Sequence, residues 1–144
     1  MIAPRPLTQK AHPVRDVAAR KAWAAKYDYC FACGASLEYL QAIGSWLETH
    51  HLIRGVGRSD EPCCLFRGCA FRCHKLCHGE HIRERGELLP TLALGCQLTI
   101  KQLATPDEYD ADRLAALYGQ CLPELKPIPE WFDMEFLRNH GRRA

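Results

Sequence analysis

Two short segments hold most of the chain's nine cysteines. The first is "YCFACG", with Cys30 and Cys33. The second spans residues 63–77 and contains Cys63, Cys64, Cys69, Cys73 and Cys77. Clustered cysteines in a chain without an export signal are more typical of metal ligands than of disulfides. The chain is therefore expected to fold around a metal-bound cysteine cluster.

The first cysteine pair has the spacing of a zinc knuckle. In "CFACG" the glycine lets the backbone turn tightly, so that the sulfurs of Cys30 and Cys33 can meet at one metal ion. A redox role is disfavoured because no βαβ pattern surrounds the pair. Cys96 and Cys121 stand alone, and we predict that both are buried core residues, as free cysteine usually is.

Length and composition favour one domain with a modest core, since the chain has 144 residues of which 47% are hydrophobic. The net charge of +2 is too small to indicate a nucleic-acid partner, so DNA binding would need a local patch of positive charge. No apolar stretch is long enough to span a bilayer, and "MIAPRPLTQK" lacks the apolar region of a signal peptide. We expect a cytoplasmic protein that does not bind membranes.

Helical patterns are predicted on both sides of the cysteine-rich part of this single domain, residues 1–144. Residues 14–29 are alanine-rich with apolar positions at helical spacing, which predicts an N-terminal helix. Residues 83–144 are predicted as a helical extension. In it, Thr105 and Glu108 form a capping-box pattern for a helix that Gly119 ends, and a last helix is predicted from Pro129.

The core is predicted at residues 30–82. In it we expect a strand at residues 45–53, a loop at 54–62 and a second strand at 63–69. A helix is expected from residue 70 onwards, and Gly79 could end it. His50 and His51 are adjacent in the first strand and must point to opposite faces. His74 and His78 are four apart on the helix, so both can reach one metal ion. If strand and helix pack together, one histidine of the pair completes this site and the other can act on water.

Taken together, "CFACG", "LETHH" and "CHKLCHG" resemble the motifs of the zinc-stapled HNH endonucleases of phages and bacteria, whose relatives include the colicin DNases. The resemblance covers residues 30–79. It implies an α+β fold with a small ββα-metal, treble-clef-like core, a structural zinc knuckle and flanking N- and C-terminal helices. It also implies a metal-dependent endonuclease that nicks or cuts duplex DNA. Such an enzyme would work with a phage packaging protein or another DNA-processing partner.

The same resemblance implies a role for each matching residue. His51 would be the general base, and Glu48 would orient a neighbouring arginine or metal ligand. The ligands of a catalytic Mg²⁺, Mn²⁺, Ni²⁺ or Zn²⁺ would be His50, His74 and His78. The ligands of a structural Zn²⁺ would be Cys30, Cys33, Cys69 and Cys73, with Cys64 or Cys77 in place of Cys69 as the alternative. Contacts to DNA phosphates are predicted for Arg54, Arg58, Arg67, Arg72 and Lys75.

Two features depart from the family pattern. The family usually spaces its second cysteine pair C-x-x-C, whereas three residues separate Cys69 and Cys73 in "CAFRC". Cys64 also stands where the central asparagine is expected. Cysteine is a weak hydrogen-bonding group, so Asp60 or another local residue would have to brace the loop between the strands. Two other functions therefore stay open. One is a zinc-stapled nucleic-acid-binding module without cleavage activity, which Cys64 favours. The other is a structural zinc protein in a phage or plasmid assembly.

Overall fold

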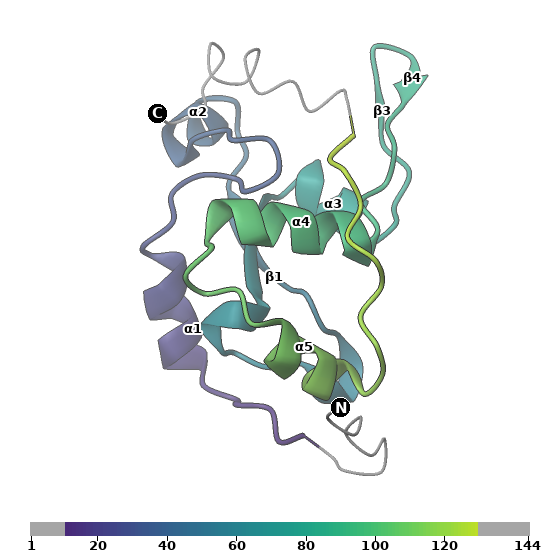
Figure 1. Ribbon diagram of the computed structural model, residues 1–144. Helices are drawn as coiled ribbons and strands as arrows, with labels where there is room; N and C mark the ends of the chain where they lie inside the picture. Colours follow the sequence, from purple (N-terminus) through teal and green to yellow (C-terminus); the bar gives the residue numbers. More distant parts are fainter. Residues whose placement is uncertain (1–10, 130–144) are drawn as a thin grey trace.

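An antiparallel hairpin of two short strands lies at the centre of the fold (Figure 1). The computed structural model describes residues 11–129 and shows a small mixed α+β protein. Strand β1 (Leu47–His51) pairs with β2 (Leu65–Cys69), so that Leu47 lies opposite Cys69 and His51 opposite Leu65. The predicted strand pairing is confirmed, although both strands are shorter than expected. The connection includes two 3₁₀ turns, Gly55–Gly57 and Pro62–Cys64.

Helix α3 (Cys73–Cys77) follows β2 almost directly and is held close to it. Gly68 permits this approach, because a Cβ at that position would lie 3.2 Å from the backbone nitrogen of His74. The helix stops at His78, and Gly79 has a φ of 76°, a conformation that glycine adopts without strain. The early end at Gly79 agrees with the sequence prediction. Strand, strand and helix therefore form one compact unit, the hairpin–helix unit.

The N-terminal helix is shorter than residues 14–29. Helix α1 (Val17–Ala24) begins where the Asp16 side chain accepts a hydrogen bond from the Ala19 backbone. Upstream of it, Val14 is held by the inter-strand loop, through bonds to the Ser59 hydroxyl and the Asp60 backbone. These extended contacts exclude residues 14–16 from the helix. A second helix, α2 (Leu37–Ala42), was not predicted.

Two helices from the C-terminal part pack against the hairpin. Helix α4 (Leu94–Ala104) lies within the predicted helical extension but was not predicted as a separate helix, and it crosses the hairpin–helix unit in Figure 1. Helix α5 (Ala111–Tyr118) ends at Gly119 as predicted, with a φ of 79°. Its predicted start at Thr105 is wrong, because Asp110 caps α5 and Thr105 instead ends α4. An exposed hairpin of β3 (Arg83–Glu84) and β4 (Glu87–Leu88) was also unpredicted.

A buried ion pair joins these elements. The Lys101 amine on α4 is completely buried and donates hydrogen bonds to Glu108 and to the Pro62 carbonyl. Trp23 and Tyr27 donate to the same Glu108 carboxylate from the N-terminal side. Burial lowers the pKa of the Lys101 amine, although its bond to Glu108 opposes that effect. Glu108 thus joins the α1 region to α4, and Lys101 joins both to the loop between β1 and β2.

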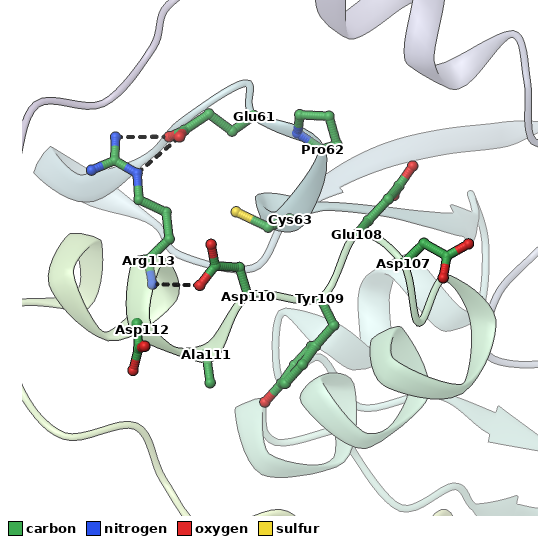
Figure 2. Close-up of a pocket in the computed structure, with 10 residues that line it drawn as sticks. All are labelled: Glu61, Pro62, Cys63, Asp107, Glu108, Tyr109, Asp110, Ala111, Asp112 and Arg113. Carbon is green, nitrogen blue, oxygen red and sulfur yellow. Dashed lines mark hydrogen bonds and ion pairs between the residues drawn. The ribbon is translucent and has the colours of Figure 1, made fainter.

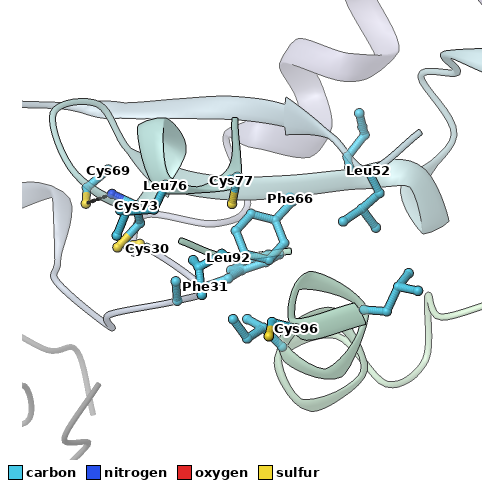
Figure 3. Close-up of a cluster of buried hydrophobic side chains, with 14 of the residues drawn as sticks. Cys30, Phe31, Leu52, Phe66, Cys69, Cys73, Leu76, Cys77, Leu92 and Cys96 are labelled. Atoms are coloured by element: carbon cyan, nitrogen blue, oxygen red, sulfur yellow. Dashed lines mark hydrogen bonds between the residues drawn. The ribbon is translucent and has the colours of Figure 1, made fainter. Parts of the chain in front are cut away.

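The core includes residues of β2, α3 and α4 together with the turn at residues 30–35 (Figure 3). Phe66 and Leu76 are fully buried, and Cys96 is buried as predicted. The prediction for Cys121 is wrong, because this residue follows α5 in an extended segment and is exposed. The helix predicted from Pro129 falls almost wholly outside the described residues. Within residues 11–129, every helix is too short or too polar to cross a membrane.

Candidate metal centres

Four cysteines form the first metal-binding group, here called the cysteine group. The sulfurs of Cys30, Cys33, Cys69 and Cys73 all lie within 4.8 Å of one another, and all four residues are buried. Cys30 and Cys33 lie in the turn before α2, Cys69 ends β2 and Cys73 begins α3. Figure 3 shows the sulfurs of Cys30, Cys69 and Cys73 together at one edge of the core, with Cys77 further along α3. This arrangement could hold one metal ion, and four buried thiolates are the ligand set of a closed structural zinc site.

Backbone amides support the cysteine group. The Cys73 amide donates to the Cys69 sulfur at 3.3 Å, and the Cys33 amide donates to the Cys30 sulfur at 3.4 Å. Burial raises the pKa of the Cys30 thiol, but hydrogen bonds from the other three cysteines outweigh this and hold it well below its ordinary value. The same contacts raise the pKa of Cys33, and burial together with them raises that of Cys73, so the group carries negative charge on Cys30 first and a metal ion would displace the remaining thiol protons.

The alternative zinc ligands lie elsewhere. Cys64 is fully buried and contacts its neighbour Cys63, with the sulfurs 3.6 Å apart. Cys77 is also buried, but neither Cys64 nor Cys77 belongs to the cysteine group. The three-residue spacing between Cys69 and Cys73 is accommodated by a turn before α3, which returns Cys73 to the sulfur of Cys69.

Three histidines form the second group, here called the His triad. Their nitrogen atoms lie within 4.8 Å of one another, with His50 on β1, His74 on α3 and His78 at the end of α3. The Nε2 atoms of His74 and His78 are 3.1 Å apart. His50 is buried, whereas His78 is exposed. The triad could therefore hold a metal ion that remains accessible to solvent.

Two side-chain oxygens determine which nitrogens face the centre of the triad. The Nδ1 of His74 lies 2.9 Å from the Glu48 carboxylate, which can only accept, so Nε2 is left to bind a cation. The Nε2 of His50 lies 2.8 Å from the Gln97 side-chain oxygen, so His50 donates there and Nδ1 is left. Each of these two histidines thus has one nitrogen held by the protein and one available, as in many metal sites.

Gln97 was missed in the sequence. Its amide nitrogen donates to the Cys77 and Leu92 carbonyls, at 3.1 and 2.7 Å, which fixes its oxygen toward His50. The residue is only 4% exposed and comes from α4, the helix that the sequence pattern did not reveal. A polar residue within the otherwise apolar "GCQLTI" was the available signal.

Burial favours the neutral form of two rings of the triad, His50 and His78. The pKa of His50 falls to about 3, chiefly because the ring is buried, although its bond to Gln97 opposes the shift. Burial also lowers the pKa of His78. Protons therefore compete weakly with a cation for these rings.

His51 lies outside the triad and binds the inter-strand loop. Its Nε2 is 2.8 Å from the Asp60 carboxylate, so it donates there and Nδ1 carries no proton in the neutral ring. Asp60 also accepts from the Asp16 backbone and lies 3.5 Å from the Arg20 guanidinium. Burial lowers the pKa of His51, while Asp60 opposes the shift. A carboxylate behind an imidazole fixes its tautomer, the arrangement that a general base needs.

The predicted phosphate-binding residues divide into three kinds. Arg54 is exposed and donates to His78 Nδ1 at 2.8 Å, and Lys75 follows His74 on α3. Arg58 is exposed and near His51. Arg67 and Arg72 serve other partners, because Arg67 binds the Tyr27 carbonyl and Thr49, and Arg72 pairs with Glu84. Positive charge available to DNA at the triad is therefore concentrated in Arg54 and Lys75.

Two pockets lie near these groups. A pocket of about 350 Å³ adjoins the triad and is lined in part by His50, His78 and Arg54. A second pocket of about 510 Å³ shares no lining residue with it (Figure 2). Its wall carries several carboxylates, including Asp107 and Asp110, while Arg113 is already paired with Glu61. The second pocket would repel phosphate, so the triad side is the better surface for DNA.

Comparison of the chain with protein-family models, with curated proteins and with solved structures gives no match. The residues and their geometry are therefore the basis of the functional proposal.

Proposed function

We propose that the protein is a metal-dependent DNA endonuclease of the HNH type, with a ββα-metal core formed by the hairpin–helix unit. The observation that carries the proposal is the His triad, in which a strand and the helix after the hairpin bring three nitrogens within 4.8 Å of one another. Glu48 and Gln97 orient two of the rings, and the site is open to solvent beside a pocket. An open histidine site is characteristic of catalytic rather than structural metals.

In this proposal His51 is the general base. The Asp60 carboxylate holds the Nε2–H of His51, which leaves Nδ1 free to take a proton from the attacking water. Asp60 thereby supplies the bracing that the absent asparagine would provide, and it ties the base to the N-terminal segment through Asp16 and Arg20. When bound to the triad, a divalent cation would stabilise negative charge on the phosphate and on the leaving oxygen.

Arg54 and Lys75 would hold the DNA backbone. A guanidinium only donates, so His78 Nδ1 accepts from Arg54 in the arrangement described. His78 can offer Nε2 as a ligand only with Nδ1 protonated, and that tautomer no longer accepts from Arg54. The exposed Arg54 then needs another acceptor, and a DNA phosphate at the edge of the triad would supply one.

A second candidate function is a zinc-stapled nucleic-acid-binding module without cleavage. It is favoured by the His51 side chain, which is only 10% exposed and already bonded to Asp60. If substrate binding does not uncover this ring, water activation would fail while DNA binding persisted.

Incubation of the purified protein with supercoiled plasmid and Mg²⁺, Mn²⁺ or Ni²⁺ tests the choice. The endonuclease proposal expects nicked or linear plasmid with the wild type and strong loss of product with His51→Ala. His81→Ala is the matched control, because His81 is exposed and lies outside the triad. Plasmid binding without cleavage under all three metals would reject the endonuclease proposal in favour of the binding module.

A further inference from the structure

An exposed pair of aromatic rings in mutual contact lies beside the triad. Trp46 and Phe71 are 46% and 52% exposed, and their ring centroids are 4.8 Å apart in an edge-to-face arrangement. The Lys75 amine lies 5.7 Å from the centre of the Phe71 ring. We propose that these three residues, here called the aromatic patch, bind unpaired bases of single-stranded DNA next to the site of cleavage.

The strand geometry places the aromatic patch on the triad side of the molecule. Trp46 lies one residue before β1 and continues its pairing with β2, so it shares a strand face with Glu48 and His50. A strand advances about 3.3 Å per residue, so Trp46 and His50 are separated by roughly 13 Å. Lys75 directly follows the triad residue His74 on α3. A DNA strand that reaches the triad would therefore continue over the aromatic patch.

The backbone beneath the aromatic patch is held firmly. The Trp46 carbonyl accepts a hydrogen bond from Ala70, which extends the pairing of β1 and β2 by one step. Phe71 lies between Cys69 and Cys73, two members of the cysteine group. The rings are thus presented by a constrained part of the chain, and such preorganisation reduces the entropy lost on binding.

The chemistry of the aromatic patch favours nucleic acid over protein. Every base has a flat face that stacks on aromatic side chains, and a neighbouring lysine can contact the phosphate backbone. A stable protein interface needs about 20–30 residues on each side, far more than this group provides. Lys75 gives the aromatic patch a positive charge of its own, and Arg54 adds a second one beside His78 of the triad.

This inference rests on the proposed function but is tested by binding alone. The probe is a fluorescein-labelled oligodeoxythymidylate of about 20 nucleotides, compared with a duplex of equal length, without added divalent cation. Trp46→Ala and Phe71→Ala should each weaken single-strand binding by about 5- to 100-fold and duplex binding much less. Trp46→Phe should retain most of the affinity. Val56→Ala is the matched control, because Val56 is an apolar residue 94% exposed in the inter-strand loop.

Tryptophan fluorescence gives a second readout. Stacking on Trp46 should quench emission when the oligonucleotide binds, and Trp46→Phe should remove that part of the quenching, leaving only what the other two tryptophans, Trp23 and Trp131, contribute. Unchanged single-strand affinity in Trp46→Ala and Phe71→Ala would overturn the inference. So would a change of oligomeric state in Trp46→Ala with DNA binding intact, which would mean that the aromatic patch contacts protein. If the wild type cleaves no DNA but its single-strand binding still depends on the two rings, the endonuclease proposal is rejected and this inference stands.

Discussion

The cysteine group and the His triad belong to the same hairpin–helix unit but differ in their access to solvent. All four cysteines are buried, whereas only His50 of the triad is. A closed set of four sulfurs leaves no position for water or substrate, while three histidines on a surface leave at least one. The difference separates a group suited to holding the fold together from a group suited to binding and exchanging ligands.

The positions of the two groups along the hairpin explain this contrast. Cys69 lies at the end of the ladder opposite Leu47, and His50 lies opposite Phe66, nearer the other end. Helix α3 serves both groups, since Cys73 and His74 are adjacent but point in directions about 100° apart. The Cys30 turn covers the first group, because Phe31 hydrogen-bonds to the Arg67 carbonyl on β2. Within the described residues, the triad has no comparable cover over the exposed His78.

The largest effect is expected from Cys30→Ser. If zinc holds the cysteine group together, its loss removes a binding free energy on the order of 10–16 kcal/mol, which exceeds the stability of a domain of this size. The variant should lose zinc, measured by mass spectrometry, and should unfold, measured by circular dichroism. Cys121→Ser is the control, because Cys121 is exposed. A folded, zinc-free Cys30→Ser protein would refute the structural role.

The next largest effect separates the base from the metal ligands. His51→Ala should lower the rate of plasmid nicking by about 10²- to 10⁴-fold, the usual loss on removing a general base, while divalent-metal affinity changes little. His74→Ala should weaken metal binding and nicking together. Calorimetric titration and single-turnover nicking measure the two quantities. If His51→Ala loses metal affinity as strongly as His74→Ala, the roles of the adjacent histidines have been exchanged.

A smaller effect is expected at Gln97. Gln97→Leu removes the acceptor that orients His50, and losing such a partner of a metal ligand typically costs about 10- to 100-fold in affinity. Zinc in the cysteine group should be unaffected. Thr99→Val is the control on the same helix, since Thr99 binds the Gly95 and Lys126 carbonyls away from the triad. Equal metal affinity in Gln97→Leu and wild type would contradict the proposed orientation of His50.

The smallest effect is the pH dependence of stability that comes from His50. The pKa of His50 falls from 6.5 to about 3 in the fold, so the folded state prefers the neutral ring. Its contribution to stability is complete above pH 6.5 and is lost as the pH falls toward 3. Between about pH 6.5 and 5.5 the protein with zinc in the cysteine group but no ion at the triad should lose about 1 kcal/mol of stability at this residue. Urea unfolding should show that the free energy of unfolding falls less steeply with decreasing pH in His50→Gln than in the wild type. Equal slopes in the two proteins would argue against a buried neutral His50.

Local patterns in the sequence predicted the hairpin, the ends at Gly79 and Gly119 and the pairs Cys30/Cys33 and His74/His78, whereas the full ligand sets were implied by the resemblance to the HNH motifs. The C-x-x-C-G turn, the strand alternation and the four-residue spacing of His74 and His78 are properties of neighbouring residues, so they can be read without a structure. The grouping of Cys69 rather than Cys64 with Cys30, Cys33 and Cys73 agrees with the set that the resemblance to the HNH motifs implied.

The unpredicted parts depend on contacts between distant segments. Helix α4 has apolar residues on more than one side, which weakens its helical signal, and its role emerges only when Gln97 meets His50 and Lys101 meets Glu108. The capping box at Thr105 failed because Glu108 is engaged by Lys101, Trp23 and Tyr27 instead of the helix start. Arg67 was expected to bind DNA, yet the Tyr27 carbonyl and Thr49 occupy its guanidinium.

The cysteine group is expected to hold a structural ion and the His triad an exchangeable one. This division is tested most directly by measuring metal content and nicking activity in one chelator-treated sample. Dialysis of the zinc-loaded, Mn²⁺-supplemented protein against EDTA should remove the ion of the triad and the activity together. About one zinc per chain should remain, with sulfur ligands by X-ray absorption, and circular dichroism should be unchanged. Adding Mn²⁺ back should restore nicking. The account is contradicted if folding and activity are lost together with a single class of ion, or if activity survives when only the sulfur-bound zinc remains.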